Sequence, residues 1–191
     1  LQPSAVKSTG GATFTRQADG TWLASGVNPE HDTYEITAPL AAGSFSGVML
    51  NAFPDASLPE QSLGRYPNGN FVLTDIDAEI IAPGMKEPIS VLFTTAEADY
   101  EQKGYEVKFI VQDKPKRGKG AKNKQGWAVD GPTRKEPRTA VFTCAPVTVP
   151  PNATIKITLR HDAIGGHNIG RFSLSSTSLP PAMVKLKGGA V

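Results

Sequence analysis

Apolar and polar residues alternate along several short stretches of the chain, and the clearest of these is 154–177. In TIKITLRHDAIGGHNIGRFSLSST, Ile, Ile and Leu alternate with polar residues over 155–159, and Phe172 and Leu174 repeat the pattern after a loop with paired glycines. A period of two places successive side chains on opposite faces of a strand. The stretch therefore predicts two half-buried strands joined by a loop.

The same alternation recurs through the chain, with turn-forming residues between the apolar stretches. We expect a hairpin over 12–24 around the turn Ala18-Asp19-Gly20, a long loop over 54–70 and one helical turn over 97–105. Further strands are predicted to begin at Tyr34 and to cover 46–53, 71–82, 89–93, 105–111, 139–143 and 147–149. Nine or ten short strands at intervals of about 8–12 residues are typical of an all-β sandwich of two antiparallel sheets.

Length and composition fit this class. A chain of 191 residues is long enough for one domain with a substantial core and short for two. Its 19 glycines and 16 prolines suit many turns. We expect one domain over 1–191, with a loosely held lead-in over 1–9 and a terminal segment or linker over 179–191. The first residues do not resemble a signal peptide, which suggests a module excised from a longer protein.

Cysteine content and hydropathy exclude several kinds of structural feature, namely disulfides, paired-cysteine zinc sites and membrane spans. The single cysteine, Cys144, excludes an internal disulfide and a paired-cysteine zinc site. Buried and inert is the default interpretation of this thiol. No apolar run approaches the ~18 residues of a membrane span, so no membrane insertion is expected.

Positive charge is concentrated in 114–138. The basic residues there are Lys114, Lys116, Arg117, Lys119, Lys122, Lys124, Arg134, Lys135 and Arg138. Only Asp130 and Glu136 oppose these nine, so the segment carries +7 in a chain of net charge +2, and the remainder carries −5. Such a segment can be a docking surface for a polyanion or a solvated loop, and both interpretations stay open.

Three other residues are candidates for contact with a sugar. Trp127, inside the basic segment, can stack on a sugar ring, although a core indole is the favoured interpretation. Arg65 and Tyr66, in the long loop, offer a guanidinium fork and a ring. The alternative is that they belong to a turn cluster that joins two strands, and this is favoured.

Acidic residues and histidines suggest metal sites only weakly. Asp75, Asp77 and Glu79 share one face of a predicted strand, which is usually a solvated face. Calcium ligation by these carboxylates, or by residues in 28–32, is the alternative. His161 and His167 flank the glycine loop, where a loop-bracing role is favoured over a metal site. No matched acid and nucleophile is evident, so we expect no enzyme.

Four motifs carry a resemblance that covers about 10–177. They are GGATFTRQADGTWLASGVNPEHDTYEIT (10–37), PNGNFVLTDIDAEI (67–80), GWAVDG (126–131) and GGHNIGRFSLSST (165–177). In this order they resemble a module of large planctomycete cytochrome c-type proteins. The resemblance implies a galactose-binding-like jelly roll that binds carbohydrate without catalysis. It also implies covalently linked haem and unknown-function domains, and a periplasmic or cell-surface location.

This chain departs from the family over 114–125, where the basic run KPKRGKGAKNKQ replaces a segment that in the family is neutral and helical. The haem ligands of the neighbouring domain are also absent. No cofactor is therefore expected in this chain, apart from the candidate calcium.

Together these features predict a non-catalytic module that tethers a larger cytochrome-type protein to a polysaccharide, and the basic run favours an acidic (uronate or sulfated) glycan. The predicted ligand-binding residues are Lys116, Arg117, Lys119, Lys122, Lys124, Trp127, Arg134, Lys135, Arg138, Arg65 and Tyr66. One alternative is a structural domain that docks neighbouring domains. Another is a nucleic-acid-binding module, which the acidic remainder and the scarcity of aromatic residues near the lysines disfavour.

Overall fold

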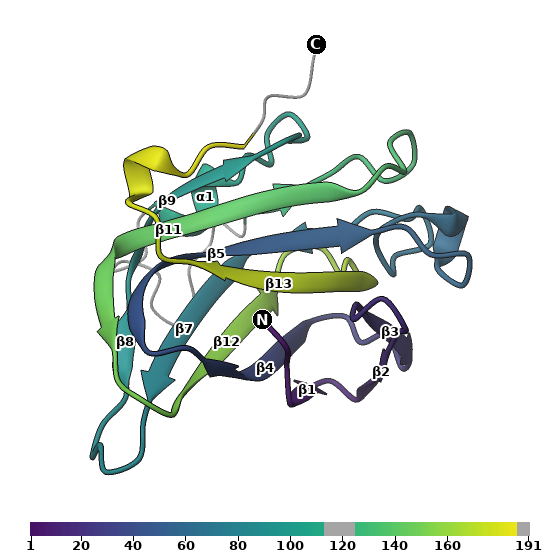
Figure 1. Ribbon diagram of the computed structural model, residues 1–191. Helices are drawn as coiled ribbons and strands as arrows, with labels where there is room; N and C mark the ends of the chain where they lie inside the picture. The colour runs from purple at the N-terminus through teal and green to yellow at the C-terminus, as the bar shows by residue number, and fades with distance from the viewer. Residues whose placement is uncertain (113–124, 187–191) are drawn as a thin grey trace.

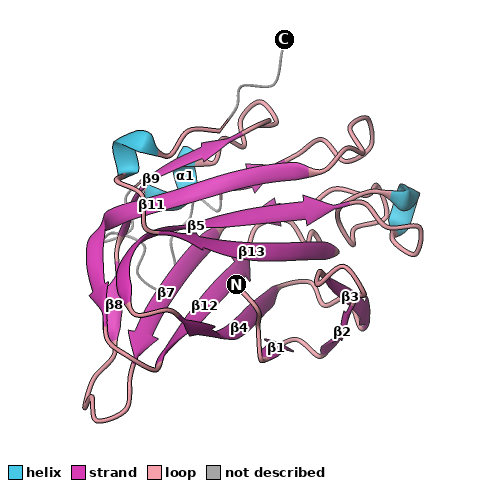
Figure 2. Cartoon of the chain, viewed as in Figure 1, coloured by secondary structure: helices cyan, strands magenta, loops and turns pink. Residues whose placement is uncertain are grey.

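Two antiparallel β-sheets pack face to face in the computed structural model, which describes residues 1–112 and 125–186 (Figures 1 and 2). Five strands form one sheet in the order β1-β4-β12-β7-β8, and six form the other in the order β2-β3-β13-β5-β11-β9. All their pairings are antiparallel. The predicted all-β sandwich is confirmed.

The elements have the following bounds. The five-stranded sheet consists of β1 (Ala5–Ser8), β4 (Asp32–Leu40), β12 (Ala153–His161), β7 (Asp75–Ile81) and β8 (Ile89–Val91). The six-stranded sheet consists of β2 (Ala12–Arg16), β3 (Trp22–Gly26), β13 (Arg171–Thr177), β5 (Gly43–Phe53), β11 (Arg138–Val149) and β9 (Phe93–Ala98). Outside them lie the pair β6 (Val72–Leu73) and β10 (Trp127–Ala128), the helix α1 (Lys108–Val111), and 3₁₀ turns over Pro59–Gln61 and Pro181–Met183.

The two strands predicted over 154–177 are confirmed as β12 and β13, but they lie in different sheets. β12 is the middle strand of the five-stranded sheet, where it pairs with β4 and β7. β13 lies inside the six-stranded sheet between β3 and β5. The loop 162–170 therefore carries the chain across one end of the sandwich from one sheet to the other.

The core lies between the two sheets and follows the alternation in the sequence. Ile155, Ile157 and Leu159 on β12 have no exposed surface, and Leu50 on β5 and Phe172 on β13 belong to the same buried cluster. Burying one such side chain stabilises the fold by roughly 1.5–3 kcal/mol. The alternating residues thus specify which face of each sheet turns inward.

Segment 97–111 differs from the prediction of a helical turn followed by a strand. β9 extends to Ala98, and a turn at Gly104, whose φ is +84°, precedes α1. Val107 and Ile110 are buried with a spacing of three residues, which fits one side of a helical turn. In YEVKFIV, apolar residues are spaced both two and three positions apart. This spacing is consistent with a strand or with a helical turn, and the structure has the helix α1 here.

Other boundaries also differ. The strand predicted over 71–82 is divided at Thr74 into β6 and β7, and the two strands predicted over 139–149 form one strand, β11, with an irregular register after Thr143. Residues 1–9 are not a loose lead-in, because Ala5–Ser8 pair with β4 at the edge of its sheet. The predicted hairpin over 12–24 is confirmed as β2 and β3.

A buried histidine ends β12. His161 Nδ1 lies 3.1 Å from the carbonyl oxygen of Asp32, and its ring centroid lies 4.6 Å from that of Tyr34. Its Nε2 is buried and has no hydrogen-bond partner among the described residues. Burial lowers the pKa of His161 to about 4. The ring is therefore neutral at pH 7, and Nδ1–H donates to the carbonyl.

This burial predicts a pH-dependent stability. The unfolded chain protonates His161 near its ordinary pKa of 6.5, whereas the folded protein does so only near pH 4. The unfolded state therefore binds more protons in this window, and the free energy of unfolding should fall as the pH is lowered from 6.5 to 4. We expect a loss of roughly 3 kcal/mol. Urea denaturation at several pH values measures it.

His161→Gln should show a shallower pH dependence than the wild type over the same window. His31→Gln, which changes an exposed histidine, is the matched control and should retain the wild-type slope. An unchanged slope in His161→Gln would show that this ring does not titrate as its burial requires.

Candidate functional site

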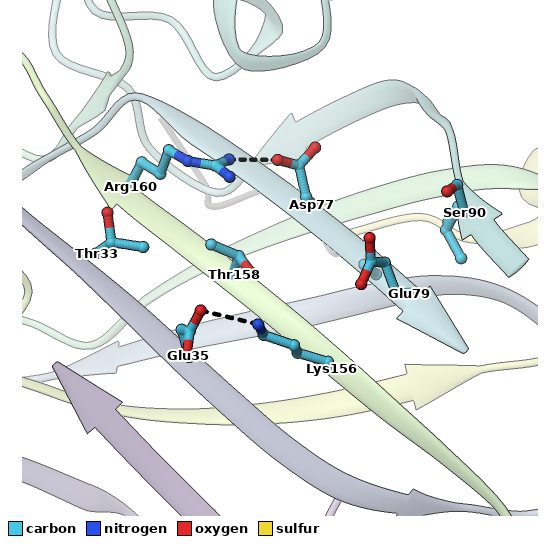
Figure 3. A pocket seen from close by; sticks show the side chains of 10 residues that line it. Thr33, Glu35, Asp77, Glu79, Ser90, Lys156, Thr158 and Arg160 are labelled. Carbon is cyan, nitrogen blue, oxygen red and sulfur yellow. Dashed lines mark hydrogen bonds and ion pairs between the residues drawn. The ribbon is translucent and has the colours of Figure 1, made fainter. Parts of the chain in front are cut away.

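A shallow groove with a volume of about 270 Å³ crosses the solvent-facing side of the five-stranded sheet (Figure 3). Its lining comes from β4, β12, β7 and β8. The side chains labelled in Figure 3 are all polar or charged: Thr33, Glu35, Asp77, Glu79, Ser90, Lys156, Thr158 and Arg160. The sheet thus presents a continuous hydrogen-bonding surface to solvent.

Strand register brings these side chains together from distant parts of the sequence. On β12, the outward residues are Lys156, Thr158 and Arg160, which alternate with the buried Ile and Leu. Thr158 lies opposite Glu35 on β4 and opposite Asp77 on β7. A hydroxyl therefore lies between two carboxylates at the centre of the groove (Figure 3).

Both cations of β12 pair with carboxylates on the neighbouring strands. Lys156 Nζ lies 2.8 Å from Glu35 Oε1. Arg160 donates to Asp77 and lies 3.5 Å from Asp75 Oδ2. The pKa of Arg160 is raised, because the hydrogen bond and the charges of these aspartates outweigh the opposing effect of partial burial. Partly exposed pairs like these contribute at most about 1 kcal/mol each, but they orient the side chains.

The predicted basic site is described only at its C-terminal end. Lys114, Lys116, Arg117, Lys119, Lys122 and Lys124 lie outside the described residues. Arg134 and Arg138 lie against the ring of Tyr100, with guanidinium carbons 4.3 and 4.9 Å from its centroid. This part of the segment is therefore anchored to the loop that follows β9.

Arg138 is not available to a ligand as predicted. It is only 9% exposed, because it begins β11 and pairs with Glu136 at 2.9 Å and with Asp99 at 4.0 Å. Lys135 Nζ donates to the carbonyl oxygen of Glu60 at 2.7 Å. Arg134 and Lys135 remain the exposed cations of the described part of this segment.

Trp127 is a core residue, and its predicted contact with a ligand is wrong. The side chain has no exposed surface, and its indole N–H donates to the carbonyl oxygen of Tyr100 at 2.9 Å. Its ring packs edge-to-face against Phe71, with centroids 5.2 Å apart. The favoured interpretation of a core indole with a backbone acceptor is confirmed.

Arg65 and Tyr66 belong to a structural loop cluster. Arg65 is buried, and its two terminal nitrogens donate to the carbonyl oxygens of Val27 and Gly26 at 2.8 and 2.9 Å. Its predicted contact with a ligand is therefore wrong. Tyr66 is half-buried and stacks on His167 at a centroid distance of 3.8 Å. The favoured interpretation, a turn cluster, agrees with these contacts.

Asn168 holds this cluster together. Its fully buried amide donates to Asn28 Oδ1 at 2.8 Å and to the carbonyl oxygen of Pro29 at 2.9 Å. Asn28 Nδ2 in turn donates to the carbonyl oxygens of Arg65 and Gly166. The loops around 28–29, 65–66 and 166–168 thus meet at one end of the sandwich and stabilise one another.

Three of the predicted metal candidates have other partners. Asp75 and Asp77 interact with Arg160, while Asp32 is buried and accepts hydrogen bonds from Ser8 Oγ and from the Gly10 amide. Within residues 1–112 and 125–186, no group of three or more His, Cys, Asp or Glu side chains is placed to hold a metal ion.

Cys144 is buried in β11, and burial raises the pKa of its thiol to about 11. A thiol with this pKa is protonated at neutral pH and is a poor nucleophile. The default interpretation of a buried, inert cysteine agrees with this environment.

Comparison of the chain with protein-family models, with curated proteins and with solved structures finds no match. The helices of the described residues are too short and too polar to cross a membrane.

The groove was not predicted from the sequence as a site. The sequence marks 75–79 as an acidic strand face and 156–160 as the polar positions of another strand, but it does not show that the two lie side by side. Knowledge that these two strands pair would have identified the groove.

Removal of the central amide tests the structural role of the loop cluster. Asn168→Ala should lower the free energy of unfolding by about 2–3 kcal/mol, because it deletes two hydrogen bonds of a buried side chain. Asn28→Ala should cost less, since Asn28 is exposed. The double variant should cost less than the sum of the two, because their shared bond is lost only once. Denaturant titration measures all three, and additive effects would contradict the coupling.

Proposed function

We propose that this domain is a non-catalytic carbohydrate-binding module, with the groove of Figure 3 as its binding surface. The observation that carries the proposal is that its polar side chains come from hydrogen-bonded strands of one sheet. Strand pairing fixes their backbone positions before a ligand arrives, which lowers the entropic cost of binding. Hydroxyls, carboxylates and ammonium groups complement the many hydroxyls of a sugar.

The form of the groove favours an extended ligand. It is open to solvent along the sheet and reaches from β4 to β8. Four neighbouring strands at ordinary spacing span about 14 Å, which exceeds a single sugar ring. A segment of a polysaccharide chain therefore fits this surface better than a compact small molecule.

Binding without catalysis is supported by the state of the central carboxylates. Glycoside hydrolysis requires one carboxylic acid that donates a proton and a second carboxylate that acts as base or nucleophile. Glu35 and Asp77 both lie in ion pairs with cations of β12, so both are occupied by partners within the sheet rather than arranged as such a pair.

A wider role is part of the same proposal. The resemblance of the four motifs supports a tether that attaches a larger cytochrome-type protein, with its haem and unknown-function domains, to a polysaccharide in the periplasm or at the cell surface. The preference for an acidic glycan stays a prediction based on the charge of 114–138, of which Arg134 and Lys135 are exposed in the described residues.

An interaction domain is the second candidate. Leu179 and Met183, after the last strand, are 53% and 67% exposed. Exposed apolar side chains of this size suit contact with a neighbouring domain of the same polypeptide.

Native affinity electrophoresis of the domain tests the proposal. We expect retardation in a gel that contains a neutral or acidic polysaccharide, without release of new reducing ends. Absence of retardation in every gel would overturn carbohydrate binding and favour the interaction domain.

A double variant of the protein tests the acidic-glycan prediction. If 114–138 binds a uronate or sulfated glycan, Arg134→Glu combined with Lys135→Glu should reduce retardation in that gel, and so should added salt, which screens surface charges beyond about 8–10 Å. Arg16→Glu combined with Lys86→Glu makes the same change of charge at exposed positions outside the segment and should have a smaller effect. Equal effects of the two double variants would show that only net charge matters.

A further inference from the structure

We infer that the groove selects a neutral, hydroxyl-rich sugar and that Glu79, with Ser90 and Thr158, is the group that recognises it. This inference rests on the proposed function and adds the class of ligand. It differs from the acidic-glycan prediction, which rests on the charge of the basic segment 114–138.

Glu79 is the carboxylate of the groove that remains open to a ligand. It is exposed on β7, opposite Lys156 on one side and Ser90 on the other. Lys156 nevertheless pairs with Glu35. Within residues 1–112 and 125–186, the Glu79 side chain has neither an ion pair nor a hydrogen bond, and its two oxygens can therefore accept from a ligand.

Hydroxyl groups with unused capacity surround this carboxylate. The side chains of Thr158 and Ser90 make no hydrogen bonds to other described residues, and both line the groove (Figure 3). Lys156 uses one of its three N–H donors on Glu35, which leaves two for an oxygen of the ligand. The free groups thus offer acceptors, hydroxyls and donors within one surface.

This combination matches a sugar with adjacent hydroxyl groups. A carboxylate can accept from two neighbouring O–H donors at once, in a charge-assisted contact stronger than a neutral hydrogen bond. An ammonium group and hydroxyls then donate to the remaining sugar oxygens. The lining contains no aromatic ring, so recognition here depends on the pattern of hydroxyls rather than on stacking.

The charge of the groove lining opposes an acidic ligand. The lining carries three carboxylates, from Glu35, Asp77 and Glu79, and two cations, from Lys156 and Arg160. Lys156 pairs with Glu35, and Arg160 pairs with Asp77. A uronate or a sulfate in the groove would therefore lie beside Glu79 with no unpaired cation among the described residues of the lining to balance it, which is unfavourable.

Isothermal titration of the intact domain with soluble oligosaccharides tests this inference. The panel contains neutral oligomers of glucose, xylose, mannose and galactose, oligomers of galacturonate, and oligomers of glucosamine as the cationic case. We expect binding to at least one neutral oligomer. Glu79→Gln, which keeps the shape but removes the charge, should weaken that binding roughly tenfold.

Glu87→Gln is the matched control, because it makes the same change at an exposed position in the turn after β7, outside the groove. It should bind like the wild type. Ser90→Ala should weaken binding by a smaller factor than Glu79→Gln, since it removes one neutral hydrogen-bonding group. Thermal unfolding of each variant, with a midpoint close to that of the wild type, shows that the fold is retained.

Each outcome decides a different question. Neutral binding that is unaffected by Glu79→Gln overturns the inference, and so does binding restricted to the galacturonate or glucosamine oligomers; both results leave carbohydrate binding itself intact. Absence of binding to every saccharide, including the polysaccharides of the electrophoresis gels, overturns the proposed function as well.

Discussion

The position of β12 between β4 and β7 is the constraint on which the rest of the structure depends. Since side chains alternate across a strand, one register decides both faces at once. It buries Ile157 and Leu159 against the other sheet and directs Lys156 and Thr158 into the groove. A slip of one residue would place charges in the core and remove the groove, so the stability of the domain and its proposed binding surface have the same origin.

The second constraint is the crossing from β12 to β13 at the end of the sandwich. Because the two strands lie in different sheets, the loop between them must cover the core. The Asn168 amide fixes this loop to the neighbouring one by donating to Asn28 Oδ1 and to the carbonyl oxygen of Pro29. These contacts give the Asn and Gly residues of 65–71 and 165–171 a structural role. Gly64 shows how closely the loops approach, since a Cβ there would lie 1.9 Å from the carbonyl oxygen of Asn70.

Alternation in the sequence was enough to predict the sandwich, the early hairpin and the strands β12 and β13. Every second side chain of a half-buried strand faces the core, and this period of two is visible within one short stretch of sequence. It failed over 105–111, where apolar spacings of two and three coexist. The groove could not be predicted, because its residues from 33–35, 77–79 and 156–160 meet only through strand pairing, which the sequence does not record. For Arg65 and Trp127 the sequence leaves a ligand contact open beside the favoured structural role, because it shows the chemistry of a side chain but not its burial.

Backbone amide NMR of the labelled domain, titrated with the oligosaccharide that binds most tightly, tests most directly whether the sheet groove is the binding surface. The structure predicts the largest shift changes at 33–35, 77–79, Ser90 and 156–160, which are far apart in the chain but adjacent in the sheet. Largest changes at 134–138, or at the loop cluster around Tyr66 and His167, with the groove amides unmoved, would contradict the account and place the ligand elsewhere.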